Sequence, residues 1–160
     1  TVLLTIGLDA DERMHIVEEV YERKLSFESF VEIVKDKKKE FNYDNIIADP
    51  SEPRFIEDFR KAGVRIMPAN NEIIPGIAEV SNRLRIAKDG KPRLFVDQKC
   101  LNTIMEFENY RYPDHKEGKP IKEKPLKIFD HSLDALRYAV MSLHEKRSIT
   151  NVFGTFKEKI

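Results

Sequence analysis

The spacing of apolar residues changes between strand-like and helical along the chain, and these changes predict the order of the elements. Two runs rich in β-branched residues, Thr1–Leu8 and Met14–Tyr21, flank a short acidic turn and predict a β-hairpin. Within Phe27–Phe41, apolar residues recur at helical spacing with charged residues between them. That pattern predicts an amphipathic helix with Ser26 as its N-cap.

Short apolar runs and helical patterns then alternate as far as residue 110. The apolar runs predict buried strands at Asp44–Asp49, Val64–Met67 and Arg93–Val96. Helices are expected at about residues 51–63, 71–87 and 99–110. Ser51 is the expected N-cap of the first. The second is expected to become regular only after Pro75 and Gly76, because proline disrupts a helix interior.

The C-terminal part contains a charged, proline-containing stretch and one more helical pattern. Residues 111–127 predict a long loop, and the pattern from about Asp130 to Glu145 predicts a helix with a broad apolar surface. We expect one domain over residues 1–145 and a tail at 146–160. Strands that alternate with helices after a hairpin indicate an α/β fold with a mixed sheet, in which the later strands are parallel.

Composition excludes several classes of protein. The 160 residues are 41% apolar and 35% charged, with 28 basic and 28 acidic side chains, so the chain is too apolar for a disordered segment and too charged for a membrane protein. No apolar run approaches the roughly 20 residues of a membrane helix, and the N-terminus lacks the features of a secretion signal. A lone cysteine, Cys100, favours a reducing compartment, so we expect an intracellular protein.

Asp49 is a candidate site residue because of its position in the pattern. It lies where an expected buried strand ends, and ligands of open α/β sheets bind at the carboxyl ends of strands. The alternative is structural, because Asp49 also opens an Asx-Pro turn, and spacing alone favours that interpretation.

A second group of candidates opens the last helix. Asp134 lies four residues after Asp130 and three after His131, so the three residues share a face. We favour an N-cap role for Asp130, and a surface histidine is the alternative for His131. Asp134 lies beside apolar residues, where a carboxylate is costly unless it is paired or binds a metal. Converging carboxylates would bind Mg²⁺ or Mn²⁺, and two such ions can support hydrolysis of a phosphodiester.

Three segments of the chain carry a family resemblance. They are Ala48–Pro53, Val80–Leu84 and Lys124–Tyr138, and the last contains the string Asp-His-x-x-Asp-Ala-Leu-Arg-Tyr. In order and separation they resemble the C-terminal nuclease domain of the large terminase subunit of tailed bacteriophages, over about residues 1–143. The string is the most specific part, whereas the Ala-Asp-Pro piece alone is weak.

The resemblance implies an RNase H-like fold, with a mixed sheet flanked by helices. It implies an acidic cluster that binds two ions of Mg²⁺ or Mn²⁺ and cuts double-stranded DNA concatemers during viral genome packaging. By this match Asp49 is the second family carboxylate, Asp134 is the third, His131 is the histidine beside the site, and Asp130 is an additional candidate ligand. The implied partners are double-stranded DNA, the portal protein and the small terminase subunit, in the cytoplasm of the infected bacterial host.

The sequence departs from the family pattern at two points. The family's first metal-binding aspartate lies on a strand before the hairpin, and no residue from Thr1 onward fills that role. We expect either that this strand lies outside the sequence or that the domain is truncated. Asp9 and Asp11 belong to the hairpin turn and are not assigned to the site. The ATPase domain of the family and its Gly-rich phosphate loop are also absent, so we expect no ATP hydrolysis.

Basic residues around the turn that follows the third predicted helix, and in the long loop before the last one, are candidates for contacts to the DNA backbone. These candidates are Arg83, Arg85, Lys119, Lys122, Lys124 and Lys127. Interspersed acidic residues leave an ordinary solvated surface as the alternative. Other chemistries have less support, because Cys100 lies on an apolar helical face and the histidines lack zinc-ligand spacing.

Two other functions stay open on the sequence. Another RNase H-like nuclease, of the Holliday-junction resolvase type, would share the metal chemistry but prefer branched DNA. A catalytically silent module that docks on DNA or on the portal would not cut at all, and the missing first aspartate keeps that interpretation open.

Overall fold

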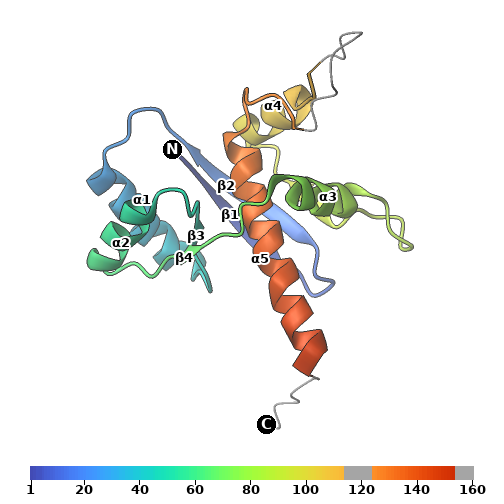
Figure 1. Cartoon of the computed structure of the whole chain (residues 1–160), viewed down its shortest axis with the longest axis horizontal. Helices are drawn as coiled ribbons and strands as arrows, with labels where there is room; N and C mark the ends of the chain where they lie inside the picture. The colour runs from blue at the N-terminus through green and yellow to red at the C-terminus, as the bar shows by residue number, and fades with distance from the viewer. Residues whose placement is uncertain (114–123, 154–160) are drawn as a thin grey trace.

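Strands and helices alternate along the chain, as the sequence predicts (Figure 1). The computed structural model describes the backbone of residues 1–113 and 124–153, and the side chains of residues 1–113 and 124–143. The described elements are β1 (Val2–Leu8), β2 (Met14–Tyr21), α1 (Phe27–Phe41), β3 (Ile47–Ala48), α2 (Pro53–Lys61), β4 (Met67–Pro68), α3 (Ile73–Leu84), β5 (Leu94–Val96), α4 (Leu101–Asn109) and α5 (His131–Phe153).

The opening hairpin and the mixed sheet are confirmed. β1 and β2 pair antiparallel, with Val2 opposite Tyr21 and Leu8 opposite Met14. β5 pairs with the other edge of β2 in the parallel direction, so the sheet has the order β1-β2-β5. The antiparallel strands therefore come from the hairpin and the parallel one from later in the chain, as expected.

β3 and β4 form a separate parallel pair that is shorter than predicted. The strand expected at Asp44–Asp49 contracts to Ile47–Ala48, and the strand expected at Val64–Met67 is displaced to Met67–Pro68. The amides of Met67 and Ala69 donate to the carbonyls of Ile46 and Ala48, at 2.9 Å each, and Pro50 follows β3 closely. α1 and α2 pack beside this pair around a buried cluster that includes Phe30, Val31, Val34, Ile56 and Phe59.

Helix α5 lies between the two halves of the molecule in Figure 1, with α1 and α2 on its left and α3 on its right. Its residues Leu133, Leu136 and Val140 are buried in one cluster with Met14 and Ile16 of β2. The helix also contacts β1 and β3. Its helical backbone continues to Phe153, beyond the predicted end at residue 145.

Two predicted helix starts are wrong. Ser51 is the expected N-cap of α2, but Glu52 occupies that position, and Ser51 instead donates its amide to Asp49. α3 begins at Ile73, so Pro75 lies inside its first turn. Proline is tolerated there because the amides of a first turn have no acceptor within the helix.

Glutamates from neighbouring elements satisfy the free amides at the starts of α4 and α5. Glu19 of β2 accepts two backbone amide hydrogen bonds at the start of α4, both of 2.8 Å. Glu106 of α4 accepts the amides of Ser132 at 2.7 Å and Leu133 at 3.1 Å. β2 therefore positions α4, and α4 in turn positions α5.

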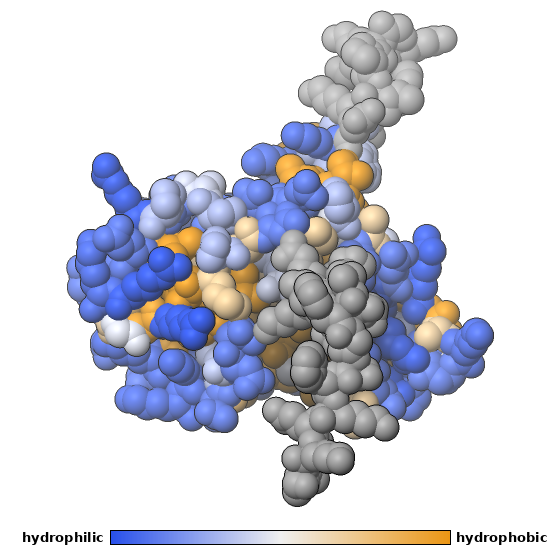
Figure 2. All heavy atoms as spheres, turned by 60° about the horizontal axis from the view of Figure 1, so that its bottom comes forward, coloured by the Kyte–Doolittle hydropathy of each residue, from blue (hydrophilic) through white to orange (hydrophobic). Residues whose placement is uncertain are grey.

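The surface is largely hydrophilic on the face that Figure 2 shows, with apolar side chains gathered near its middle. Among the described residues, no helix is long and apolar enough to cross a membrane.

Candidate functional site

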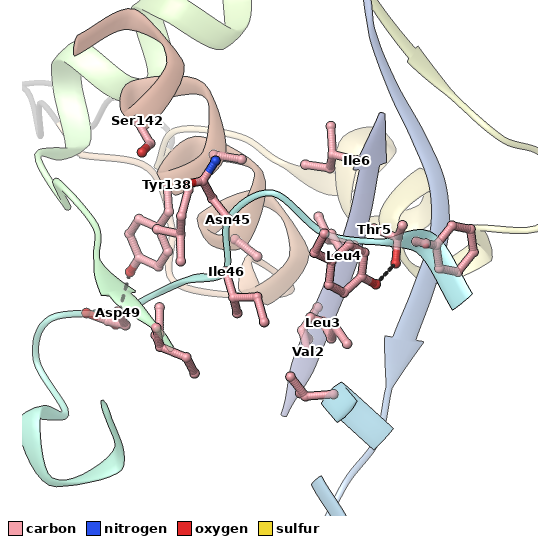
Figure 3. A pocket seen from close by; sticks show the side chains of 18 of the residues that line it. Val2, Leu3, Leu4, Thr5, Ile6, Asn45, Ile46, Asp49, Tyr138 and Ser142 are labelled. Atoms are coloured by element: carbon pink, nitrogen blue, oxygen red, sulfur yellow. Dashed lines mark hydrogen bonds between the residues drawn. The ribbon is translucent and has the colours of Figure 1, made fainter. Parts of the chain in front are cut away.

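A cleft of about 690 Å³ lies between β1, the end of β3 and α5 (Figure 3). Asp49, His131 and Asp134 all line it. Among the strands in the described part of the chain, β1 pairs only with β2, and β3 pairs only with β4. The cleft therefore has an unpaired strand edge on each side and α5 across it.

Asp49 follows β3, and its two carboxylate oxygens have different partners. Oδ1 accepts the amide of Ser51 at 2.9 Å, which is the Asx turn that the spacing favours. Oδ2 accepts the hydroxyl of Tyr138 at 3.0 Å, and Figure 3 shows Tyr138 pointing from α5 toward Asp49. The turn and the cleft position coexist, so the two interpretations of Asp49 do not exclude each other.

Hydrogen bonds keep the Asp49 carboxyl ionised. Partial burial raises its pKa, but hydrogen bonds from Ser51, Tyr138 and Asn71 outweigh that effect, and the net pKa lies below its ordinary value. Asp49 is therefore held in its charged form, which is the form that binds a cation.

Asp134 lies in the first turn of α5 and pairs with Arg137, whose Nη2 is 2.6 Å from Asp134 Oδ1. This ion pair compensates the cost of a carboxylate beside apolar residues. Arg137 is buried, and its Nη1 donates to the carbonyl of Asn71 at 2.9 Å and to that of Glu72 at 3.1 Å, just before α3. Asp134 is thus anchored to α3 through Arg137, while its own side chain stays 35% exposed.

The other two candidates lie at the start of α5. His131 is exposed at the cleft, and its ring centroid is 6.4 Å from that of Tyr21. Asp130 is half-buried, and desolvation together with the charge of Asp134 raises its pKa. Asp130 stands at the expected N-cap position, and its carbonyl accepts the Asp134 amide at 2.8 Å. The amides of Ser132 and Leu133 in the first turn bind the buried Glu106 of α4.

The two carboxylates in the cleft are ligands of the type that a hard divalent cation takes. Mg²⁺ in proteins is commonly bound through one or two carboxylates together with waters and substrate phosphates, and Asp49 and Asp134 are such donors. Within the described residues, no group of three or more His, Cys, Asp or Glu side chains is arranged to hold a metal ion. The described part of the site therefore falls short of the three carboxylates that the resemblance implies.

The basic candidates differ in their accessibility. Arg83 is only 5% exposed, and a buried guanidinium does not reach a DNA backbone, so we remove it from the DNA-binding set. Lys119 and Lys122 lie outside the described residues. The remaining candidates are exposed, and they are Arg85, Lys124 and Lys127.

Three residues of the site region were not assigned roles by sequence reasoning: Glu106, Arg137 and Tyr138. Arg137 and Tyr138 follow Asp134 by three and four residues, so helical spacing carried a signal for their shared face. Glu106 carried no such signal, because the amides that it caps belong to a helix far along the chain.

The fold and the cleft together define a class of protein. A mixed sheet flanked by helices, with one carboxylate after a strand and a second on a helix packed across the sheets, is the arrangement of an RNase H-like α/β domain. The family model "Terminase RNAseH like domain" matches residues 1–142, and the chain belongs to this family of terminase RNase H-like domains.

Individual relatives agree with this assignment. The chain is 28% identical over 141 residues to the PBSX phage terminase large subunit of Bacillus subtilis strain 168, covering 86% of this chain and 30% of that protein. The large terminase of a thermophilic bacteriophage matches with a TM-score of 0.75 and 25% identity, covering 89% of this chain and 36% of that one. The chain therefore spans about a third of the length of these two proteins.

A solved nuclease domain is also similar. The nuclease domain of the g2p large terminase from bacteriophage SPP1, crystallised with bound Mn, has a TM-score of 0.63 and 29% identity to the chain. The match covers 86% of this chain and 76% of that domain. The expected family and the expected fold class are thus confirmed.

Proposed function

We propose that this domain is a Mg²⁺- or Mn²⁺-dependent endonuclease that cuts double-stranded DNA concatemers during viral genome packaging. The observation that carries the proposal is the meeting of Asp49 and Asp134 in one cleft, the first from the end of β3 and the second from α5. Carboxylate oxygens are the ligands that these hard cations take. The similar SPP1 nuclease domain was crystallised with bound Mn, which supports the choice of metal.

Each candidate has a separate role in the proposed reaction. Asp49 and Asp134 would hold two divalent ions, and such ions supply charge stabilisation to the attacking and leaving oxygens of a phosphodiester. His131 is exposed at the cleft and is the proposed histidine beside these ligands. Asp130 is the proposed additional ligand, and its pKa, raised by desolvation and by the charge of Asp134, reflects a concentration of negative charge that a cation would neutralise.

A third carboxylate would complete the proposed site. β1 and β3 both line the cleft with an edge that no described strand occupies, so an additional extended strand would find backbone partners on both sides. Such a strand would place a side chain near Asp49. We propose this position for the first metal-binding aspartate that the family resemblance implies.

The proposed partners follow from the exposed cations and from the relatives. Lys124 and Lys127 precede α5 and are proposed to contact the DNA backbone with Arg85, while Lys119 and Lys122 remain proposals outside the described residues. The other proposed partners are the ATPase domain of the same large subunit, the portal protein and the small terminase subunit. The proposed location is the cytoplasm of the infected bacterial host.

The proposal is tested by nicking and linearisation of supercoiled plasmid in Mn²⁺, comparing the wild type with Asp49→Asn and Asp134→Asn. Asp44→Asn is the matched control, because Asp44 is an exposed aspartate that also lines the cleft. We expect both site variants to lose cleavage and the control to keep it. Cleavage that persists in both site variants would refute the proposed site.

A catalytically silent docking module is the second candidate, and the lack of a three-ligand acidic group among the described residues favours it. DNA binding by the wild type without cleavage at any Mn²⁺ concentration would support this candidate. A comparison of linear with four-way DNA also tests the resolvase type of nuclease, which predicts faster cutting of the branched substrate.

A further inference from the structure

We propose that Tyr138 is a positioning residue that holds the Asp49 carboxylate to α5, the helix that carries Asp134. The inference rests on the proposed function for the identity of the ligand, a divalent cation. The link between the two walls of the cleft is a property of the fold, so it is open to measurement without the metal.

Tyr138 directly joins the two segments that carry the cleft carboxylates. Its hydroxyl donates to Asp49 Oδ2 at 3.0 Å, across the space between α5 and the end of β3 (Figure 3). Asp134 precedes it by four residues, so the carboxylate and the phenol lie one above the other on the same helical face. This hydrogen bond links Asp49 directly to α5, beside the hydrogen bond that Asn71 makes to the same carboxyl.

The ring of Tyr138 is supported from α3. The Arg137 guanidinium lies 5.0 Å from the ring centroid and also binds Asp134. Close packing on α3 leaves Arg137 little freedom, because a Cβ atom added at Gly76 would overlap Arg137 Cγ. One buried arginine thus orients both Asp134 and the phenol that binds Asp49.

The Tyr138 hydroxyl occupies one of the two carboxylate oxygens of Asp49, Oδ2. Asp49 Oδ1 is meanwhile occupied by the Ser51 amide. With both oxygens anchored, the carboxylate is ordered before a cation arrives, which lowers the entropy cost of binding.

Loss of an outer partner of a metal ligand typically weakens metal affinity or activity by about 10- to 100-fold. We therefore expect Tyr138→Phe to raise the Mn²⁺ dissociation constant by about tenfold or more. The substitution removes the hydroxyl alone and keeps the ring against Arg137. Tyr43→Phe is the matched control, because Tyr43 lines the same cleft and its hydroxyl bonds Thr5 rather than a candidate ligand.

Two measurements on the full chain separate this inference from the proposed function. Calorimetric titration with Mn²⁺ reports the metal affinity of the wild type, Tyr138→Phe and Tyr43→Phe. Amide hydrogen exchange without metal reports the Ser51 N–H, which is bonded to Asp49, with the Met14 amide of the sheet as the reference for global opening. We expect Tyr138→Phe alone to weaken Mn²⁺ binding and to accelerate exchange at Ser51 relative to Met14.

Each outcome decides the inference. Unchanged Ser51 exchange in Tyr138→Phe would overturn the positioning role, and faster exchange with unchanged Mn²⁺ affinity would overturn its importance for the metal. If the wild type neither binds Mn²⁺ nor cuts plasmid, the proposed function fails. The metal-binding role of Tyr138 then fails with it, while the exchange at Ser51 still decides whether Tyr138 holds Asp49 in place.

Discussion

Glu106 offers the sharpest test of how the start of α5 is held in place. Its side chain is completely buried, and its Oε2 accepts the backbone amides of Ser132 and Leu133 and the hydroxyl of Ser132. Its Oε1 accepts the hydroxyl of Tyr21 at 2.9 Å. Because Asp130, His131 and Asp134 all lie at this end of the helix, the same carboxylate positions the candidate site.

The cost of Glu106→Gln follows from these bonds. Hydrogen bonds to a charged acceptor contribute about 1.5–3 kcal/mol each, and neutral ones about 0.5–1.5 kcal/mol. The three bonds at Oε2 would therefore weaken by about 1 kcal/mol each, for a total loss of about 3 kcal/mol in the free energy of unfolding. The new amide group can donate to the Tyr21 hydroxyl, so we assign no further cost there. For a domain of this size, the loss corresponds to a fall of about 6–12 °C in melting temperature.

The assay is urea and thermal unfolding followed by far-ultraviolet circular dichroism. Glu108→Gln is the matched control, because Glu108 lies on the same helix but is exposed, and an exposed substitution usually changes stability by less than about 0.5 kcal/mol. If Glu106→Gln proved as mild as Glu108→Gln, the capping of α5 from α4 would be refuted.

Three further predictions concern packing, pH and salt. Gly76→Ala should destabilise the domain by about 1–3 kcal/mol in denaturant unfolding, since the added Cβ would overlap the buried Arg137 side chain. If the variant proved as stable as the wild type, α3 would have to shift to accommodate the Cβ. Hydrogen bonds, chiefly from Arg93, lower the pKa of the Asp89 carboxyl to about 2. The contribution of Asp89 to the free energy of unfolding should therefore be complete above about pH 4, its ordinary pKa, and be lost as pH falls through about 2. Unfolding curves should therefore show Asp89→Asn less stable than the wild type at pH 5, with the difference shrinking as pH falls toward about 2, and a constant difference would contradict this. DNA affinity should fall steeply as the salt concentration rises. Replacing any one of the exposed cations Arg85, Lys124 and Lys127 by glutamine should reduce the slope of log affinity against log salt concentration by about one. An unchanged slope would exclude a phosphate contact at that residue.

Sequence pattern was sufficient for the elements that depend on local spacing. The hairpin and α1 with its Ser26 cap were predicted, because alternation and helical periodicity act over neighbouring residues. Boundaries were less accurate wherever proline was involved. Pro75 fits into a first turn where the pattern predicts a break.

The candidate site likewise contains residues that the sequence pattern identified and partners that it did not. Asp49 and Asp134 were recognisable because one ends a strand and the other lies on an apolar helix, and both positions are local properties of the chain. Local spacing carried no information on the partners from distant segments, such as Glu106 for α5 or Asn71 for Arg137. Those contacts depend on how α3, α4 and α5 pack together, because a buried polar group takes whichever partner the packing brings within hydrogen-bond distance.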